Sequence, residues 1–118
     1  MPLMNFLRNR IEAFKYAWKG LVVFFVQENS AKVHGIAAIL VIALGFYFDV
    51  SRTEWLILLL TIALVFATEI LNTAIEEMVD LMHPEQSPKA GKVKDIAAGA
   101  VLVVSVIAVV VAVLVFVF

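Results

Sequence analysis

Residues 55–80 of the chain read WLILLLTIALVFATEILNTAIEEMVD. As far as Phe66 the stretch is almost wholly apolar, and from Glu69 to Asp80 it carries four carboxylates and one asparagine. An ionisable side chain at the centre of a bilayer costs about +2.5 to +3.5 kcal/mol on insertion scales, so such residues usually have a function where they occur. The stretch therefore predicts a membrane helix that brings a functional polar face to one surface of the bilayer.

The composition indicates a membrane protein. Of the 118 residues, 64% are hydrophobic and 16% are charged, against about 25% charged residues in ordinary soluble domains. The mean hydropathy is +1.03, which excludes an ordinary soluble globular protein. The length predicts a single domain over residues 1–118, and the absence of cysteine excludes disulfides and thiolate metal sites.

Three apolar stretches are candidates for membrane spans: residues 35–48, 55–68 and 96–118. Only the third reaches the roughly 20 residues that a helix needs to cross a bilayer unaided. The first two must include polar neighbours in order to cross. The approximate limits of the expected spans are residues 29–49, 54–81 and 94–118.

A helix over about residues 5–27 is expected to lie on the membrane surface rather than to cross it. Its apolar face holds Leu7, Ile11, Phe14, Trp18, Val22 and Phe25, and its opposite face holds Arg8, Glu12, Lys15 and Lys19. Such a helix lies in the interface with its basic side toward anionic headgroups. The predicted fold is thus an all-α membrane protein with one amphipathic surface helix and three transmembrane helices.

The distribution of Lys and Arg predicts which side of the membrane each loop faces. Residues 1–27 and the loop at 83–95 are rich in these residues, whereas the turn between the first two spans has only Arg52. By the positive-inside rule, the N-terminus and the 83–95 loop face the cytoplasm. The polar extensions of the first two spans and the start of the third then converge on that side.

The polar residues of the second span form a stripe along the expected helix. The residues that share the face are Glu69, Asn72, Glu76 and Asp80, because they follow one another at intervals of three and four residues. Glu77 points away from this face. Glu69 is the deepest of the set in the membrane, and Asp80 lies near the aqueous surface.

This stripe suits a site for a divalent cation and a phosphate group. With Glu28 approaching from the first span, its carboxylates offer oxygen ligands to Mg²⁺, which usually takes one or two carboxylates plus substrate phosphates. Lys94 is expected to contact those phosphates as a point charge. Glu69, deeper than the metal ligands, is the candidate general base for a hydroxyl that never leaves the bilayer.

Each of these residues also has a plainer interpretation. Glu69 and Asn72 fit polar contacts between membrane helices, and the acidic residues after them fit the solvated end of a helix. Lys94 and Asp95 fit the cap and anchor of the third span. His34 is expected to lie at the membrane interface or to pair with another group rather than to bind a metal.

For the whole chain, two alternatives to an enzyme are open. One is a small oligomeric ion or proton pathway lined by Glu69 and Asn72. The other is a structural subunit of a larger membrane complex. The outer half of each span is almost wholly apolar, which argues against conduction, and a structural subunit has no need for Glu28, Glu76 and Lys94 on one surface.

Four segments resemble a known family of membrane enzymes. They are "AFKYAWKGL" (13–21), "QENSAKVHG" (27–35), "EILNTAIEEMVD" (69–80) and "AGKVKDIAAGAVLV" (90–103). The chain is similar, from about residue 12 to its end, to the prokaryotic diacylglycerol kinase family, small three-span membrane kinases that include the undecaprenol kinases. The last two segments are the most specific.

The resemblance implies a homotrimer in the bacterial cytoplasmic (inner) membrane, with active sites between subunits on the cytoplasmic side. It implies Mg²⁺-dependent transfer of the ATP γ-phosphoryl group to the hydroxyl of a membrane lipid alcohol. The segment "ENSAKVHG" slightly favours undecaprenol over diacylglycerol. ATP, the lipid alcohol and the bilayer are the expected partners, and no nucleic acid is expected.

The resemblance also implies roles for individual residues. The implied general base is Glu69. The residues implied to hold Mg²⁺ are Glu28 and Glu76, and those implied to contact ATP are Tyr16, Glu28, Glu76, Lys94 and Asp95. The residues implied to line the site are Trp18, Asn72 and Asp80. The N-terminal arginine that meets the nucleotide in the family matches either Arg8 or Arg10.

Overall fold

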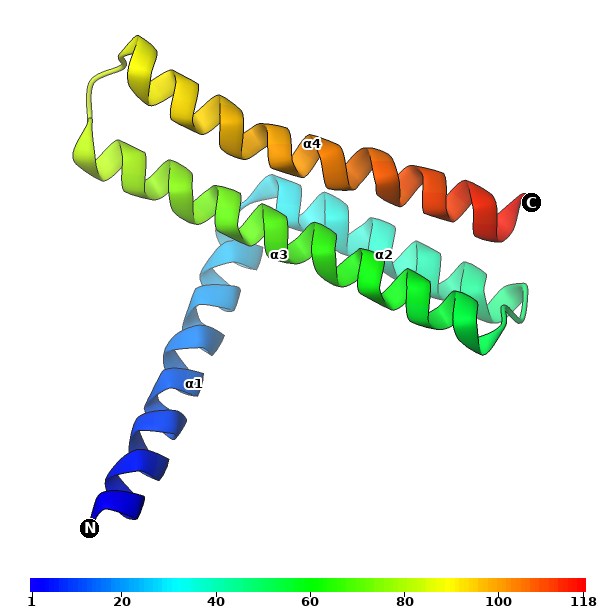
Figure 1. The fold of residues 1–118 in the computed structure, drawn as a ribbon, viewed down its shortest axis with the longest axis horizontal. Helices are drawn as coiled ribbons and strands as arrows, with labels where there is room; N and C mark the ends of the chain where they lie inside the picture. The colour runs from blue at the N-terminus through cyan, green and yellow to red at the C-terminus, as the bar shows by residue number, and fades with distance from the viewer.

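The computed structural model describes all 118 residues and contains four helices and no strand (Figure 1). The helices are α1 (Pro2–Gln27), α2 (Asn29–Tyr47), α3 (Arg52–Met82) and α4 (Pro88–Phe116). The all-α fold predicted from the sequence is therefore confirmed. One amphipathic helix precedes three apolar ones, in the predicted order.

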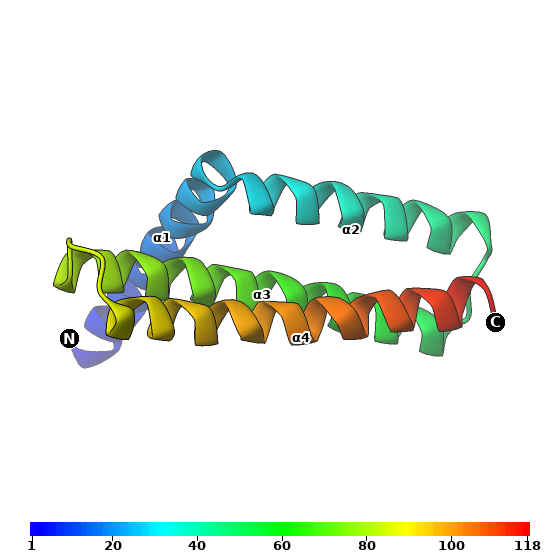
Figure 2. The same cartoon turned by 90° about the horizontal axis from the view of Figure 1, so that it is seen from above.

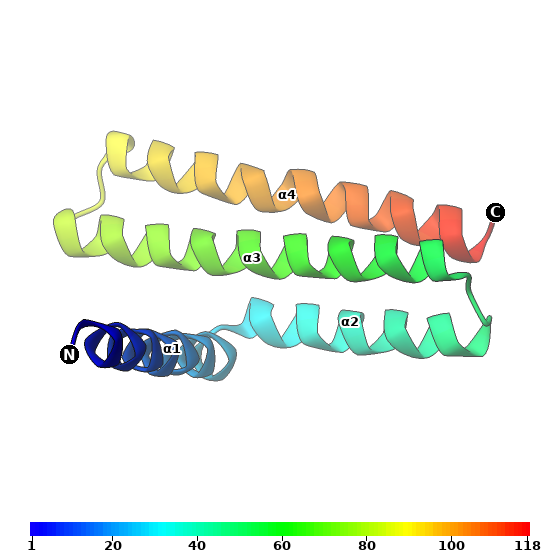
Figure 3. The same ribbon diagram turned by 60° about the horizontal axis from the view of Figure 1, so that its bottom comes forward.

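The three apolar helices lie side by side (Figures 1 and 3), and α1 leaves them at a steep angle (Figure 1). α3 packs mainly against α4 as an antiparallel hairpin, and α2 makes fewer contacts with α3. Figure 2 shows α2 set apart from the α3–α4 pair. The loop between α3 and α4 lies at the end of the bundle near α1, beyond the start of α2, and the C-terminus lies at the other end (Figure 1).

The burial pattern is that of a membrane protein. Only 10 of 118 residues are buried, and most large apolar side chains of α2, α3 and α4 point outward. In water such exposure is unfavourable by about 25 cal/mol per Å² of apolar surface, whereas hydrocarbon removes that penalty. Each of the three helices is also long and apolar enough to cross a bilayer. The chain is therefore a membrane protein with three spanning helices.

Local hydrogen bonds define the turn between α2 and α3. Asp49 takes a left-handed backbone conformation with φ of 49°, which Asp tolerates better than most residues. Ser51 and Glu54 then form a capping box. The Ser51 hydroxyl accepts from the Glu54 N–H at 3.1 Å, and the Glu54 carboxylate accepts from the Ser51 N–H at 3.0 Å.

The start of α4 bears on one of the plainer interpretations. The Ser87 hydroxyl caps the helix by accepting from the Ala90 N–H at 3.2 Å, and Pro88 occupies the first turn, where its missing N–H is harmless. Lys94 and Asp95 therefore lie inside the helix, past its first turn. The interpretation that these two residues cap the helix is wrong.

The C-terminal end of α2 meets the N-terminal end of α3 at Gly45. The Trp55 indole lies directly over this glycine and tilts against the Phe46 ring, with 4.9 Å between ring centroids. A Cβ atom at position 45 would come within 2.5 Å of the indole Cη2 atom. The absence of a side chain at Gly45 therefore permits the close approach of the two helices.

We expect Gly45→Ala to lower the free energy of unfolding by about 1–3 kcal/mol, because the added methyl overpacks the contact with Trp55. The measurement is an SDS titration in mixed micelles followed by circular dichroism. Gly35→Ala is the matched control in the same helix, since nothing lies within 4 Å of a Cβ built there. Equal midpoints for the two variants would contradict the role given to Gly45.

Candidate active site

The polar face of α3 runs from the interior of the bundle out to its end near the α3–α4 loop. Glu69 is 6% exposed and Asn72 is 8% exposed, and they are the buried polar residues of the chain. Glu76 is half-buried, whereas Asp80 and Glu77 are exposed. Within the bundle, burial along this face thus decreases from Glu69 to Asp80.

Two side chains of α2 contact the Glu69 carboxylate. The Ser30 hydroxyl donates a hydrogen bond to Glu69 Oε1 at 2.9 Å. The His34 Nε2 atom lies 3.6 Å from Glu69 Oε2. The buried carboxylate therefore has one hydrogen bond and one close polar neighbour, which lowers the penalty for placing it inside the bundle.

Asn72 and Glu76 are joined one turn further along α3. The Asn72 Nδ2 group donates to Glu76 Oε1 at 3.1 Å. The Asn72 Oδ1 atom is buried without a hydrogen-bond partner. Because a buried polar atom of this kind is unfavourable unless it is paired, it is a candidate acceptor for a donor that comes from outside this chain.

The end of the polar face carries an ion pair between α3 and α4. The Lys94 ammonium contacts the Asp80 carboxylate, and both side chains are partly exposed. These two residues border a cavity of about 420 Å³ at the α3–α4 loop, which is lined by His83, Pro84, Glu85, Gln86, Ser87, Pro88, Ala90 and Gly91 as well. Nearly all of the lining residues are polar or small. Asp95, the next residue of α4, is exposed.

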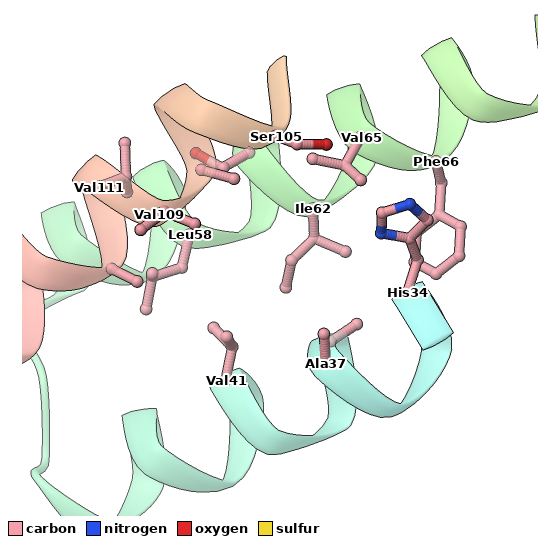
Figure 4. A pocket seen from close by; sticks show the side chains of 14 residues that line it. His34, Ala37, Val41, Leu58, Ile62, Val65, Phe66, Ser105, Val109 and Val111 are labelled. Atoms are coloured by element: carbon pink, nitrogen blue, oxygen red, sulfur yellow. The ribbon is translucent and has the colours of Figure 1, made fainter. Parts of the chain in front are cut away.

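A second cavity, of about 210 Å³, lies between α2, α3 and α4 (Figure 4). Its walls are mostly small or branched apolar side chains, such as Ala37, Val41, Ile62 and Val109. The Thr61 hydroxyl on its wall donates to the Ile57 carbonyl of its own helix. At one end of the cavity the His34 imidazole lies beside the Phe66 ring (Figure 4).

The candidate residues of α1 lie apart from this face. Tyr16 and Trp18 are 69% and 61% exposed, and α1 points away from the bundle (Figure 1). Tyr16 has the Lys19 ammonium 5.8 Å from its ring centroid. α1 contacts α3 at the C-terminal end of α1. There the Phe25 ring packs on the Phe66 ring, with 5.6 Å between ring centroids. Within one chain, Tyr16 and Trp18 are not brought to Glu69.

The carboxylates predicted to hold Mg²⁺ come from different elements. Glu28 is half-buried at the extended junction between α1 and α2, and its side chain makes no cap hydrogen bond. Glu76 lies on α3. No group of three His, Cys, Asp or Glu side chains is close enough to hold a metal ion. The residues fit Mg²⁺ only as an ion that takes one or two carboxylates and completes its shell with phosphates and water.

The contact between Ser30 and Glu69 was not predicted from the sequence. A signal was present nevertheless. Ser30 and His34 are four residues apart, so on a helix they share one face. The pairing of His34 with another group was predicted, and the structure places Glu69 next to it.

Comparisons with known proteins identify the family of the chain. The family described as prokaryotic diacylglycerol kinase matches residues 15–116. The chain is 38% identical over 112 residues to the undecaprenol kinase of Bacillus subtilis. The matched region covers 95% of this chain and 91% of that protein. It is 34% identical over 100 residues to the diacylglycerol kinase of Escherichia coli, which covers 85% of this chain and 82% of that protein. The chain belongs to the prokaryotic diacylglycerol kinase family.

Proposed function

We propose that this chain is a lipid kinase that transfers the γ-phosphoryl group of ATP to the hydroxyl of a membrane lipid alcohol, with Glu69 as the general base. The observation that carries the proposal is the position of the Glu69 carboxylate. It is buried in a spanning helix, accepts a hydrogen bond from Ser30 and lies next to the His34 imidazole. His34 in turn lines an apolar cavity.

The apolar cavity supports a lipid as the acceptor. Its walls offer mostly hydrocarbon contacts, and its polar end adjoins Glu69 through His34. A lipid alcohol with its tail in the hydrocarbon presents its hydroxyl at this depth without leaving the bilayer. Among the lipids, undecaprenol is slightly favoured over diacylglycerol by the "ENSAKVHG" segment at residues 28–35.

The polar cavity at the α3–α4 loop supports nucleotide binding. Lys94 on its border supplies a cation for phosphate oxygens. To bind them, its ammonium group exchanges the Asp80 carboxylate for the phosphate. Asp95 follows on the same helix. Glu28 and Glu76 would hold Mg²⁺, which when bound neutralises charge on the phosphates. Asn72 keeps the Glu76 carboxylate in place by donating to Oε1.

The proposed reaction is a direct transfer. The lipid hydroxyl gives its proton to the Glu69 carboxylate as its oxygen forms a bond to the γ-phosphorus. The bond between that phosphorus and the β–γ bridging oxygen breaks, and ADP leaves. Positioning and charge stabilisation supply most of the rate enhancement in such transfers. Burial of Glu69 among helices keeps water from competing with the lipid hydroxyl.

We also propose a homotrimer, with the N-terminus and the active sites on the cytoplasmic side of the bacterial inner membrane. Two observations support shared sites. Tyr16 and Trp18 are exposed and lie apart from Glu69 in their own chain, and the buried Asn72 Oδ1 atom has no partner within the chain. A neighbouring subunit is the simplest source of the missing contacts.

The first experiment is transfer of labelled γ-phosphate from Mg-ATP by the purified protein in mixed micelles. One arm contains undecaprenol, and the other contains diacylglycerol. Label in either lipid supports the proposal, and the better acceptor is the preferred substrate. Label in neither lipid would overturn it and favour the ion or proton pathway.

We expect Glu69→Gln to lower kcat by about 10²–10⁴-fold, the usual contribution of a general base, because the amide cannot accept the hydroxyl proton. The oligomeric state in detergent should stay that of the wild type. Glu77→Gln, a matched change at an exposed carboxylate of α3 that lies off this polar face, should leave kcat unchanged. Wild-type turnover by Glu69→Gln would exclude this residue as the base.

We expect Asn72→Ala to raise the Mg²⁺ concentration needed for half-maximal activity by about 10–100-fold, the usual effect of losing a group that orients a metal ligand. The reason is the loss of the hydrogen bond to Glu76 Oε1. Activity is measured against free Mg²⁺ at saturating lipid. Glu76→Gln should shift the curve in the same direction, and an unchanged curve for both variants would exclude Glu76 as a metal ligand.

A further inference from the structure

The Glu69 carboxylate is contacted differently at its two oxygens. Ser30 and His34 lie on successive turns of α2 and face the same carboxylate on α3. Oε1 accepts the Ser30 hydrogen bond at 2.9 Å. Oε2 lies 3.6 Å from His34 Nε2, which is beyond hydrogen-bond length, so this oxygen accepts no hydrogen bond from the protein.

The Ser30 hydrogen bond restricts the rotation of the carboxylate. The terminal torsion of a glutamate is broad and roughly two-fold, so an unrestrained carboxylate presents either oxygen to a substrate. With Oε1 bound to the Ser30 hydroxyl, the two oxygens are no longer equivalent. Oε2 becomes the oxygen with its lone pairs free for an incoming hydroxyl.

The position of His34 is itself fixed. Its ring meets the Phe66 ring edge to face, with 6.4 Å between centroids, at the end of the apolar cavity (Figure 4). When Nε2 carries its hydrogen, it attracts the carboxylate without forming a hydrogen bond to Oε2, because the two atoms are 3.6 Å apart. His34 therefore stabilises the orientation set by Ser30 and leaves Oε2 open.

We propose that Ser30 and His34 are positioning residues that select Oε2 of Glu69 as the oxygen that takes the lipid hydroxyl proton. The inference rests on the proposed function. It makes the α2 pair part of the catalytic apparatus, although neither residue was a candidate site residue from the sequence. It also predicts that their loss slows the proton transfer and leaves Mg-ATP binding intact.

The test is steady-state kinetics of purified variants in mixed micelles, with KM for Mg-ATP and kcat determined separately. Ser30→Ala and His34→Leu should each lower kcat about tenfold, as expected for loss of one polar interaction, with KM for Mg-ATP unchanged. His34→Gln should recover most of the activity, because its amide N–H reaches about the same position as Nε2. A role in packing alone would instead favour leucine over glutamine.

Thr68→Val is the matched control for Ser30→Ala. It removes a hydroxyl next to Glu69 in the sequence that donates to the Leu64 carbonyl of its own helix and does not contact the carboxylate. Its kcat should equal that of the wild type. Circular dichroism and elution from a sizing column establish that each variant has folded and assembled like the wild type.

A double-mutant cycle tests the Ser30–Glu69 contact without using activity. The SDS midpoint shifts of Ser30→Ala and Glu69→Gln should not add in the double variant, because the two changes remove the same interaction. Additive shifts would overturn the inference, as would wild-type kcat in both Ser30→Ala and His34→Leu. An inactive wild type would instead overturn the proposed function first. Loss of kcat in His34→Gln equal to that in His34→Leu would exclude the role given to His34.

Discussion

The structure depends on the unfavourable free energy of a carboxylate inside a membrane bundle. Glu69 is 6% exposed in a helix that is otherwise almost wholly apolar for its first half. That penalty falls when the group gains polar contacts, and α2 supplies them through Ser30 and His34. The Ser30 hydrogen bond that lowers this penalty also orients the two carboxylate oxygens of Glu69. Stability of the bundle and geometry of the site thus depend on one interaction.

The loose packing of α2 bears on the proposed lipid acceptor. α3 and α4 pack closely, whereas α2 makes fewer contacts with α3, among them Gly45 with Trp55 near one end and Ser30 with Glu69 near the other. Between these two points lies the apolar cavity. In water such a gap between helices would be unfavourable, but hydrocarbon chains fill it without loss. The proposed lipid acceptor would enter between the helices at this cavity.

Much of the fold could be predicted from local patterns. The hydropathy of residues 96–118 and the helical spacing of Glu69, Asn72 and Asp80 are properties of single segments, so the all-α membrane fold and the polar stripe of α3 could be predicted from them. The start of α4 at Pro88 could not be predicted in this way, because the residues before Lys94 are mostly polar and show no apolar pattern. The Ser87 cap decides that boundary.

Only the tertiary structure decided which side chains meet across helices. Ser30 and Glu69 are 39 residues apart, and their contact depends on how α2 rotates and slides against α3. The Lys94–Asp80 pair likewise depends on the length and path of the α3–α4 loop. The sequence by itself determined the helices, their membrane character and the polar stripe, because these arise from neighbouring residues. The asymmetric environment of the Glu69 carboxylate arises from packing, and no single segment encodes it.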